Sequence, residues 1–263
     1  MIGREIQKRT YQIACEQRKN ISLFLNDVFV KDITSDTLEQ FKSDLMAKTK
    51  LSNRSINMHM VTVKKVLRYA IRKSWMAELP QVRSLPENYL DKEIEFLSKD
   101  QVQTILKHAD GNQAFYITLL IFTGLRPKEM TELQWKHINL EKEHLDVYSS
   151  NSLKRGRRIP LNQTTLNLLI QRKRKSKSDT VSPYSASRYA SEKMGKLTKA
   201  SGVKFTPYTL RRTFGSWLVQ NGVGLLEVAE LMGHRNIETT RKHYARLIDD
   251  NLKSAIGKLD LIL

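Results

Sequence analysis

The sequence is poor in cysteine and in long apolar runs, and each scarcity excludes a class of protein. One cysteine, Cys15, occurs in 263 residues, which excludes an intrachain disulfide and a cysteine-based zinc cluster. A single thiol fits a reducing cytoplasm. No apolar segment of signal-peptide form follows Met1, and the longest apolar run, 114–122, is far too short to span a bilayer. We therefore expect a soluble, intracellular protein.

Acidic residues are scarce as well. The chain has 27 Asp and Glu against 45 Lys and Arg, a formal net charge of +18. Such a surplus fits a polyanionic partner, most often nucleic acid, although solvated lysine faces would also produce it. Residues 154–178 hold nine Lys or Arg and no acid, and so one-sided a segment favours a surface that faces phosphates.

Apolar residues recur with helical spacing over most of the chain. The pattern stops at the polar, proline-containing stretch 79–92, which predicts a linker. It restarts at Ser98, where the spacing from Ser98 to Gln101 has the form of a capping box. We expect three parts: a helical domain at 1–84, a linker at 85–96, and a second domain at 97–263 that ends in a tail at 246–263.

The second domain is expected to be mostly helical, with a small β hairpin. Leu145 and Val147 alternate with polar residues, and residues 158–161 predict a return strand after a turn at 154–157. Helices are expected at about 112–122, 163–174, 185–200, 207–221, 224–232 and 236–248. The predicted fold class is therefore mainly α, with a mixed α+β second domain.

Three fragments of the second domain combine the residue types that phosphodiester chemistry requires. They are 123–127 with Arg126, 206–211 with Arg211, and 233–244 with His234 and Tyr244. Negative charge builds on the non-bridging oxygens during phosphoryl transfer, and an arginine fork can donate two parallel hydrogen bonds to them. A phenolic oxygen can attack phosphorus when cations or a proton acceptor assist it. Taken alone, either arginine could form a surface salt bridge and the tyrosine could simply pack in the interior. The combination of both arginines, the histidine and the tyrosine predicts covalent cleavage of a DNA strand.

Lys154 and His234 have further roles in this chemistry. Lys154 lies at the predicted turn, and its ammonium can protonate a leaving 5′ oxygen if neighbouring cations lower its pKa. A phosphate contact without a catalytic part explains Lys154 equally well. His234 can hydrogen-bond a non-bridging oxygen or the tyrosine. No cluster of acids has the spacing of metal ligands, so we expect neither a metal nor another cofactor.

The second domain resembles the catalytic domain of the tyrosine recombinase (phage integrase) family. Its Thr-Gly-Leu-Arg box is matched at 123–126, with an acid three residues later at Glu129. The box around the second arginine is matched at 206–214, and the terminal box at 231–234 and 239–244. Tyr208 stands where the family has the first histidine of His-x-x-Arg. Residues 1–84 resemble the family's SAM-like, helical core-binding domain.

The resemblance implies a site-specific DNA recombinase of the integrase or excisionase type, from a phage or mobile element. Tyr244 would form a 3′-phosphotyrosyl bond, and strands would exchange through a Holliday junction in a homotetramer on double-stranded DNA. The implied setting is the nucleoid of a prokaryotic cytoplasm, with an accessory DNA-bending or directionality factor as a further partner. The implied catalytic residues are Arg126, Lys154, Tyr208, Arg211, His234 and Tyr244, supported by Glu129. The expected DNA contacts are Arg155, Arg157, Arg158, Arg172, Lys173, Arg174, Lys175 and Arg212.

Two other functions remain open. A non-catalytic DNA-binding regulator would use Ala229 and Gly233, whose spacing matches a helix-turn-helix. A nicking–closing enzyme similar to a type IB topoisomerase would use nearly the same residues as a recombinase. The substitution Tyr244→Phe separates a binder from an enzyme, and relaxation of supercoiled DNA without paired sites would favour the topoisomerase.

Overall fold

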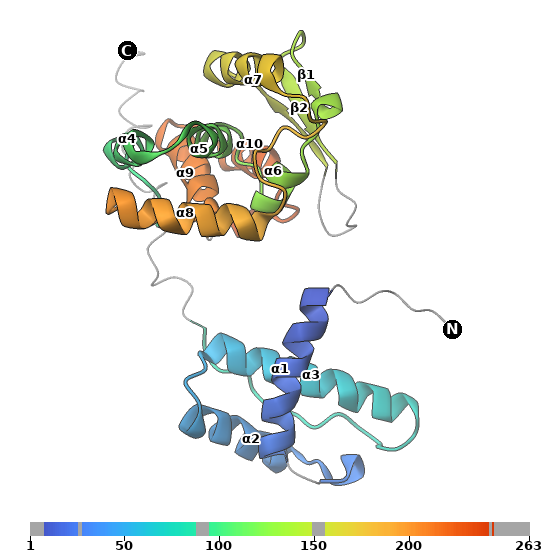
Figure 1. The fold of residues 1–263 in the computed structure, drawn as a ribbon. Coiled ribbons are helices and arrows are strands. Elements are labelled where there is room, and N and C mark those ends of the chain that lie inside the picture. Colours follow the sequence, from blue (N-terminus) through green and yellow to red (C-terminus); the bar gives the residue numbers. More distant parts are fainter. Residues whose placement is uncertain (1–7, 26–27, 88–94, 149–155, 242–243, 245–263) are drawn as a thin grey trace, which may run out of the picture. The chain divides into compact units, whose positions relative to one another are not determined.

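The computed structural model describes residues 8–25, 28–87, 95–148, 156–241 and Tyr244. The chain divides into two compact units, Met1–Tyr89 (unit 1) and Leu90–Leu263 (unit 2) (Figure 1). Each unit has its own hydrophobic core. Within the described residues, no helix combines the length and the apolar character that a membrane crossing requires.

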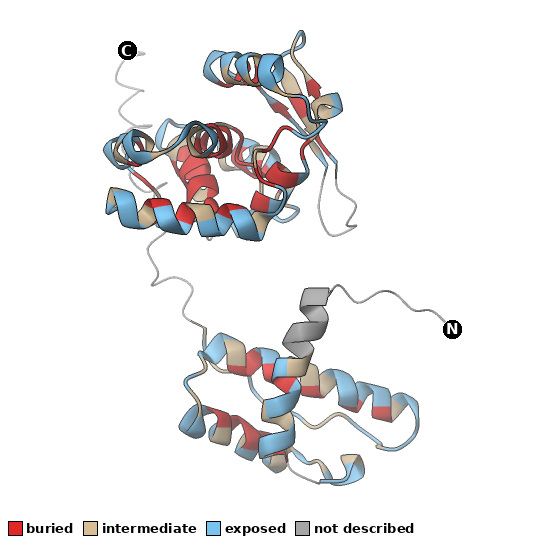
Figure 2. Cartoon of the chain, in the orientation of Figure 1, coloured by how far each residue is buried: buried red, intermediate tan, exposed pale blue. Residues whose placement is uncertain are grey.

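Unit 1 is a bundle of three α-helices: α1 (Lys8–Phe24), α2 (Ser35–Lys48) and α3 (Asn53–Arg72). The short 3-10 helix η1 (Val30–Asp32) precedes α2. Thr34 caps α2 by accepting the Thr37 N–H, and Ser52 caps α3 in the same way, because a side-chain oxygen satisfies a backbone donor that the first turn leaves free. The buried positions of α2 and α3 follow the helical period and form one continuous core (Figure 2).

The segment after α3 is fastened to unit 1 by asparagine side chains. Asn57 is buried, accepts the Leu85 N–H at 2.8 Å and donates to the Leu85 carbonyl at 2.9 Å and to the Glu87 carboxylate at 2.8 Å. Asn53 donates to the Pro86 carbonyl at 2.9 Å. The linker that the sequence predicts at 85–96 therefore begins with residues that are bound to α3.

Unit 2 contains most of the helices. These are α4 (Lys99–His108), α5 (Gly111–Thr123), α6 (Pro127–Glu132), α7 (Gln163–Lys175), α8 (Ser187–Ser201), α9 (Pro207–Gln220) and α10 (Leu225–Met232), and residues 237–241 are also helical. The capping box expected at Ser98 is present, since its side chain accepts the Gln101 N–H. Each predicted helix of this domain that lies within the described residues is found, with ends shifted by a few residues.

A three-stranded antiparallel sheet completes unit 2. Its order is β1 (Ile138–Asn139), β2 (His144–Val147), β3 (Arg157–Pro160), and Leu145 pairs with Ile159. The expected hairpin is thus present, whereas β1, only two residues long, has too few positions to show an alternating pattern. The predicted fold class, mainly helical with a small sheet, is confirmed.

Two neighbouring helices, α5 and α9, run through the middle of unit 2 and are buried along most of their length (Figures 1 and 2). α5 is apolar almost throughout and ends at Gly124, whose φ of 58° lies in the left-handed region. A Cβ at this position would lie 2.2 Å from the Phe214 ring of α9, so only glycine allows so close an approach. The packing brings the C-terminal end of α5 against α9, which carries Arg211.

Candidate active site

Arg126 lies in the turn between α5 and α6. Its Nη1 donates to Glu129 Oε1 at 2.7 Å, and its Nη2 donates to the backbone carbonyl of Gly233 at 2.7 Å. Glu129 Oε2 accepts the Arg126 backbone N–H at 2.8 Å, and Pro127 starts α6, where a missing N–H costs little. The Arg126 guanidinium is therefore fixed both by the first turn of α6 and by the turn that follows α10.

Arg211 projects from α9 and is 5% exposed. Its Nη1 donates to the Gly124 carbonyl, and its Nη2 donates to the Met232 carbonyl and lies 3.3 Å from His234 Nε2. Burial, followed by the positive charge of Arg126, lowers the pKa of Arg211 to about 9. The group stays positively charged near neutral pH, and carbonyl oxygens compensate for the lost water.

His234 completes the cluster and is held by Thr240. Its Nδ1 lies 2.8 Å from Thr240 Oγ1, and Thr240 is fully buried. Because a guanidinium only donates, His234 Nε2 acts as the acceptor toward Arg211, and Nδ1 carries the proton and donates to Thr240. Thr240 was not among the expected site residues, although it lies in the terminal box of the sequence.

The two arginines retain donors for a ligand. A guanidinium has five N–H groups; bonds to described residues use two of those of Arg126 and three of those of Arg211. Each therefore keeps at least two N–H groups, and His234 lies beside Arg211. Cationic forks held in place on rigid turns suit the non-bridging oxygens of a phosphodiester.

Tyr244 is 1% exposed and packs against the same turn. Its hydroxyl donates to Met232 Sδ at 3.3 Å, and a Cβ at Gly215 would come within 2.2 Å of the hydroxyl oxygen. Burial raises the pKa of Tyr244 to about 12, although Arg211 and Arg212 act in the opposite direction. In this conformation the phenol is protonated near neutral pH.

The other expected site residues, two catalytic and one supporting, fall in different surroundings. Tyr208 is exposed in the first turn of α9, three residues before Arg211. Glu129 is nearly buried and binds two arginines, one of which is Arg126. Lys154 lies outside the described residues. Within the described ranges, no group of three His, Cys, Asp or Glu side chains is placed to hold a metal ion.

Two neighbouring arginines of β3, both expected to contact DNA, point in opposite directions. The Arg158 side chain is exposed and donates to Asp146 at 2.8 Å. The Arg157 side chain is only 5% exposed and binds Glu129. The structure thus places Arg157 inside the cluster and not on the surface, because residue 157 shares the inward face of the strand with Ile159.

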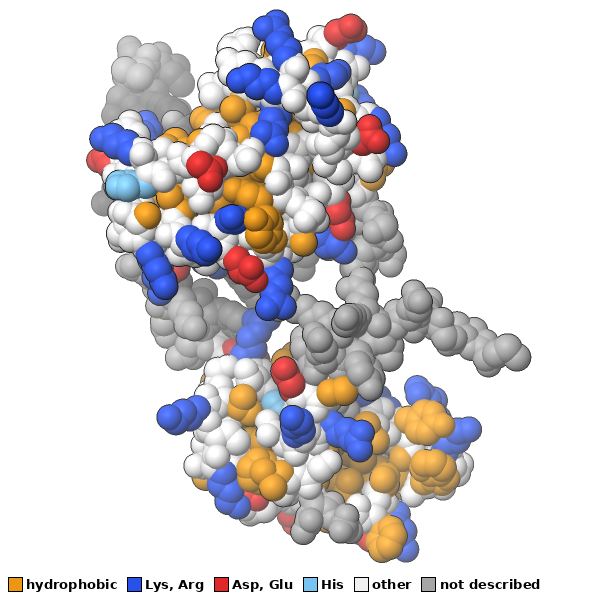
Figure 3. Space-filling view, viewed as in Figure 1, with side chains coloured by type: hydrophobic (Ala, Val, Ile, Leu, Met, Phe, Trp, Pro, Cys, Tyr) orange, Lys and Arg blue, Asp and Glu red, His pale blue; other side chains and the backbone are white. Residues whose placement is uncertain are grey.

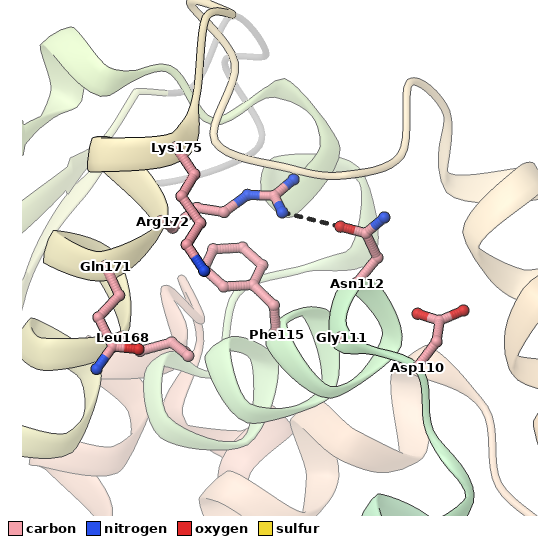
Figure 4. Close-up of a pocket in the computed structure, with 8 residues that line it drawn as sticks. All are labelled: Asp110, Gly111, Asn112, Phe115, Leu168, Gln171, Arg172 and Lys175. Atoms are coloured by element: carbon pink, nitrogen blue, oxygen red, sulfur yellow. Dashed lines mark hydrogen bonds between the residues drawn. The ribbon is translucent and has the colours of Figure 1, made fainter.

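The basic residues expected on α7 lie at its C-terminal end, where Lys and Arg side chains gather on the face seen in Figure 3. Arg172 donates to Asn112 at 2.8 Å, lies over the Phe115 ring at 4.9 Å, and lines with Lys175 a hollow of about 510 Å³ (Figure 4). The exposed residues of this group are Lys173, Arg174 and Lys175. Arg212 is half-buried on α9, and Arg155 lies outside the described residues.

The sequence matches the phage integrase family over residues 95–250 and the SAM-like domain of phage integrases over residues 2–84. The chain belongs to the phage integrase family. This chain is 30% identical to the tyrosine recombinase XerA of Pyrococcus horikoshii over 233 residues, 82% of this chain and 78% of that protein. The identification as a tyrosine-type site-specific DNA recombinase, expected from the sequence, is confirmed.

Solved structures share the fold of this chain. The Tn1549 transposon integrase in complex with transposon right end DNA superposes with a TM-score of 0.81 at 18% identity, covering 98% of this chain and 96% of that one. A lambda integrase tetramer bound to a Holliday junction gives a TM-score of 0.72 at 20% identity, covering 92% of this chain and 74% of that one. At these identities the likeness concerns the fold.

Proposed function

We propose that this protein cleaves and rejoins double-stranded DNA with Tyr244 as the nucleophile. The observation that carries the proposal is the convergence of four side chains from three segments that are far apart in the sequence. Arg126, Arg211 and His234 meet around the turn after α10, and Tyr244 packs against Met232 of the same turn. No single structural need explains why three cationic or imidazole groups and a phenol converge there, whereas phosphoryl transfer uses each of them.

In the proposed step, the phenolic oxygen of Tyr244 forms a bond to phosphorus and the bond to the 5′ oxygen breaks. The phenol releases its proton to solvent, and the departing 5′ oxygen takes up a proton, for which Lys154 is the proposed donor. Arg126, Arg211 and His234 stabilise the charge on the non-bridging oxygens. The product is a 3′-phosphotyrosyl ester, so one ester replaces another without consuming water or a nucleotide.

Strand exchange follows from the reverse reaction. The 5′ hydroxyl of a second duplex attacks the phosphotyrosyl ester, releases the phenol and joins the new strand, which generates a Holliday junction. Two duplexes cleaved on both strands need four active sites, so we propose a homotetramer on DNA. The lambda integrase tetramer bound to a Holliday junction supports this assembly. We place the reaction on the nucleoid in the cytoplasm, and an accessory factor stays a prediction.

The basic surfaces are proposed to bind the duplex. Lys173, Arg174, Lys175 and Arg158 are exposed, and cations of this kind contact phosphates irrespective of sequence. Tyr208 is exposed in the first turn of α9, three residues before Arg211, and we propose that its hydroxyl donates a hydrogen bond to a phosphate. Arg157 does not belong to these surfaces because its side chain is buried.

The test uses DNA flanking the gene, tiled as duplexes with single nicks that trap cleavage, and the full-length protein in EDTA. We expect a covalent protein–DNA adduct on a denaturing gel from wild type and none from Tyr244→Phe, with equal DNA affinity. Mass spectrometry should place the nucleotide on the peptide that contains residue 244. An adduct from Tyr244→Phe would contradict the proposed nucleophile, as would DNA binding by wild type without any adduct across the tiled set.

The proposed roles of Arg126 and Arg211 are tested with the same substrates. Arg126→Ala and Arg211→Ala are each expected to lower the single-turnover cleavage rate by about two to three orders of magnitude, with a much smaller loss of DNA affinity. Equal losses of cleavage and binding would contradict a catalytic role for either residue.

A further inference from the structure

Arg157 is the residue through which the β hairpin joins the site. Its Nη2 lies 3.0 Å from Glu129 Oε2 and its Nη1 3.3 Å from Glu129 Oε1. Its Nε donates to the Leu231 carbonyl of α10 at 2.6 Å. One side chain of β3 is therefore bonded at the same time to α6 and to α10, two elements that frame the proposed phosphate site.

Glu129 is shared between two guanidiniums. The carboxylate that binds Arg157 also accepts the Nη1 and the backbone N–H of Arg126. Burial opposes its ionisation, but the hydrogen bonds and charge of Arg157, together with those of Arg126, outweigh burial and lower the pKa of Glu129 to about 2. The carboxylate is therefore fully ionised at neutral pH, and its negative charge falls within the arginine cluster.

Close packing at Gly233 lets Arg157 reach this position. A Cβ at Gly233 would lie 3.0 Å from Arg157 Cδ and 2.9 Å from its Nη1. Gly233 also has a φ of 64° and ends α10, and its carbonyl accepts Arg126 Nη2. The turn that carries His234 is thus in contact with Arg157 on one side and with Arg126 on the other.

We propose that Arg157 is a positioning residue for DNA cleavage, which holds the hairpin against the His234 turn and supplies a buried positive charge that offsets Glu129. The inference rests on the proposed function. It replaces a surface phosphate contact, the role that the sequence suggests, with a role inside the site.

The charge of the cluster gives this role a physical basis. Arg126, Arg157 and Arg211 with the single carboxylate of Glu129 carry a formal charge of +2, which falls to +1 without Arg157. Negative charge builds on the phosphate oxygens as phosphorus becomes five-coordinate, and fixed charges act strongly in a site shielded from water. Without Arg157, Arg126 is the one arginine of the described residues that remains bound to Glu129, and the carboxylate neutralises its charge. The transition state therefore loses more stabilisation than the bound DNA does.

The experiment compares four proteins in single-turnover cleavage of the nicked substrate at saturating DNA: wild type, Arg157→Lys, Arg157→Met, and Arg157→Met combined with Glu129→Gln. We expect Arg157→Met to cleave about a hundredfold more slowly than wild type, with DNA affinity changed by less than about threefold. Arg157→Lys keeps the charge, and its cleavage rate is expected to lie between those of wild type and Arg157→Met. The double variant restores the formal charge of +2 and is expected to cleave faster than Arg157→Met.

The controls separate this role from simple support of the fold. Arg188→Met makes the same chemical change at an exposed arginine of α8 and should cleave and melt like wild type. If Arg157 only supported the fold, the double variant would cleave no faster than Arg157→Met. The cleavage rates of the variants would then rank in the same order as their melting temperatures. That result would overturn the proposal, as would cleavage at the wild-type rate by Arg157→Met, or losses of affinity and cleavage of equal size. No adduct from wild type would instead contradict the proposed function and, with it, this inference.

Discussion

The carboxylate of Glu129 is nearly buried, with 10% of its side chain exposed, and yet it stays ionised between two arginines. The family resemblance marked this acid, three residues after Arg126, as a supporting residue. It gave no sign of the second arginine, which comes from β3. A buried carboxylate with two cationic partners links the stability of unit 2 to pH.

The pH dependence of stability tests this pair. The pKa of Glu129 is depressed from 4.5 to about 2 in the folded chain, so its contribution is present above about pH 4.5 and is lost as pH falls towards 2. The shift corresponds to about 3 kcal/mol. We expect urea unfolding of wild type and Glu129→Gln to differ by this order of magnitude at pH 6, and the difference to shrink steadily towards pH 2.5. A difference that does not change with pH would contradict the ion pair.

Arg157 shows what a residue-by-residue interpretation misses. Arg157 and Arg158 both lie in the basic segment 154–178, and both were expected to bind DNA. Strand alternation carries the missing information, since residues 157 and 159 share one face and Ile159 is buried. Applied to this hairpin, the period of two places Arg157 inward with Ile159 and Arg158 outward, which agrees with their observed burial.

At the scale of elements, helix starts were the easiest features to predict. Ser98 caps the helix that it was expected to cap, because capping depends on a few adjacent residues. Element ends that depend on tertiary packing were missed. β1 exists because its two residues pair with β2, and residues 79–87, polar and proline-containing, are held on unit 1 by side chains of α2 and α3.

The turn between α5 and α6 provides the prediction at this scale. Gly124→Ala would strain a residue with a φ of 58° and place a methyl group 2.2 Å from the Phe214 ring, and the Gly124 carbonyl binds Arg211. We expect unfolding in denaturant to show a loss of roughly 2–4 kcal/mol, from backbone strain and overpacking together, and DNA cleavage to fall.

Gly202 is the matched control for this change. Its φ is 70°, and a Cβ at this position would have no atom within 4 Å. Gly202→Ala should therefore cost only the backbone term, about 1 kcal/mol, and leave cleavage intact. Equal effects at the two glycines would show that contact with Phe214 does not set the geometry of the turn.

At the scale of the whole molecule, the charge of +18 dominates. Much of it is exposed, as on the last turn of α7, and some of it is buried around Glu129. Only the exposed cations release counterions from DNA when they bind phosphates. Affinity and catalysis thus draw on different arginines of the same chain.

Salt dependence separates these contributions. We expect the logarithm of the DNA association constant to fall by about 0.9 per neutralised phosphate against the logarithm of salt concentration. Replacing exposed Arg174 with Ala should reduce this slope by about one if it contacts a phosphate, whereas Arg157→Met should leave the slope unchanged. Fluorescence anisotropy over a series of KCl concentrations measures both. A flat response of wild type would contradict the role of the basic surfaces.

The sequence by itself determined the mainly helical fold class, most helix starts, the β2–β3 hairpin and the family, because these depend on local spacing and on short motifs. It also named Arg126, Arg211, His234 and Tyr244. Only the tertiary structure decided which groups share hydrogen bonds: Arg157 with Glu129, Thr240 with His234, and the Tyr244 hydroxyl with Met232. Those contacts join segments that are distant in the chain, and burial sets their charge states, so no local pattern encodes them.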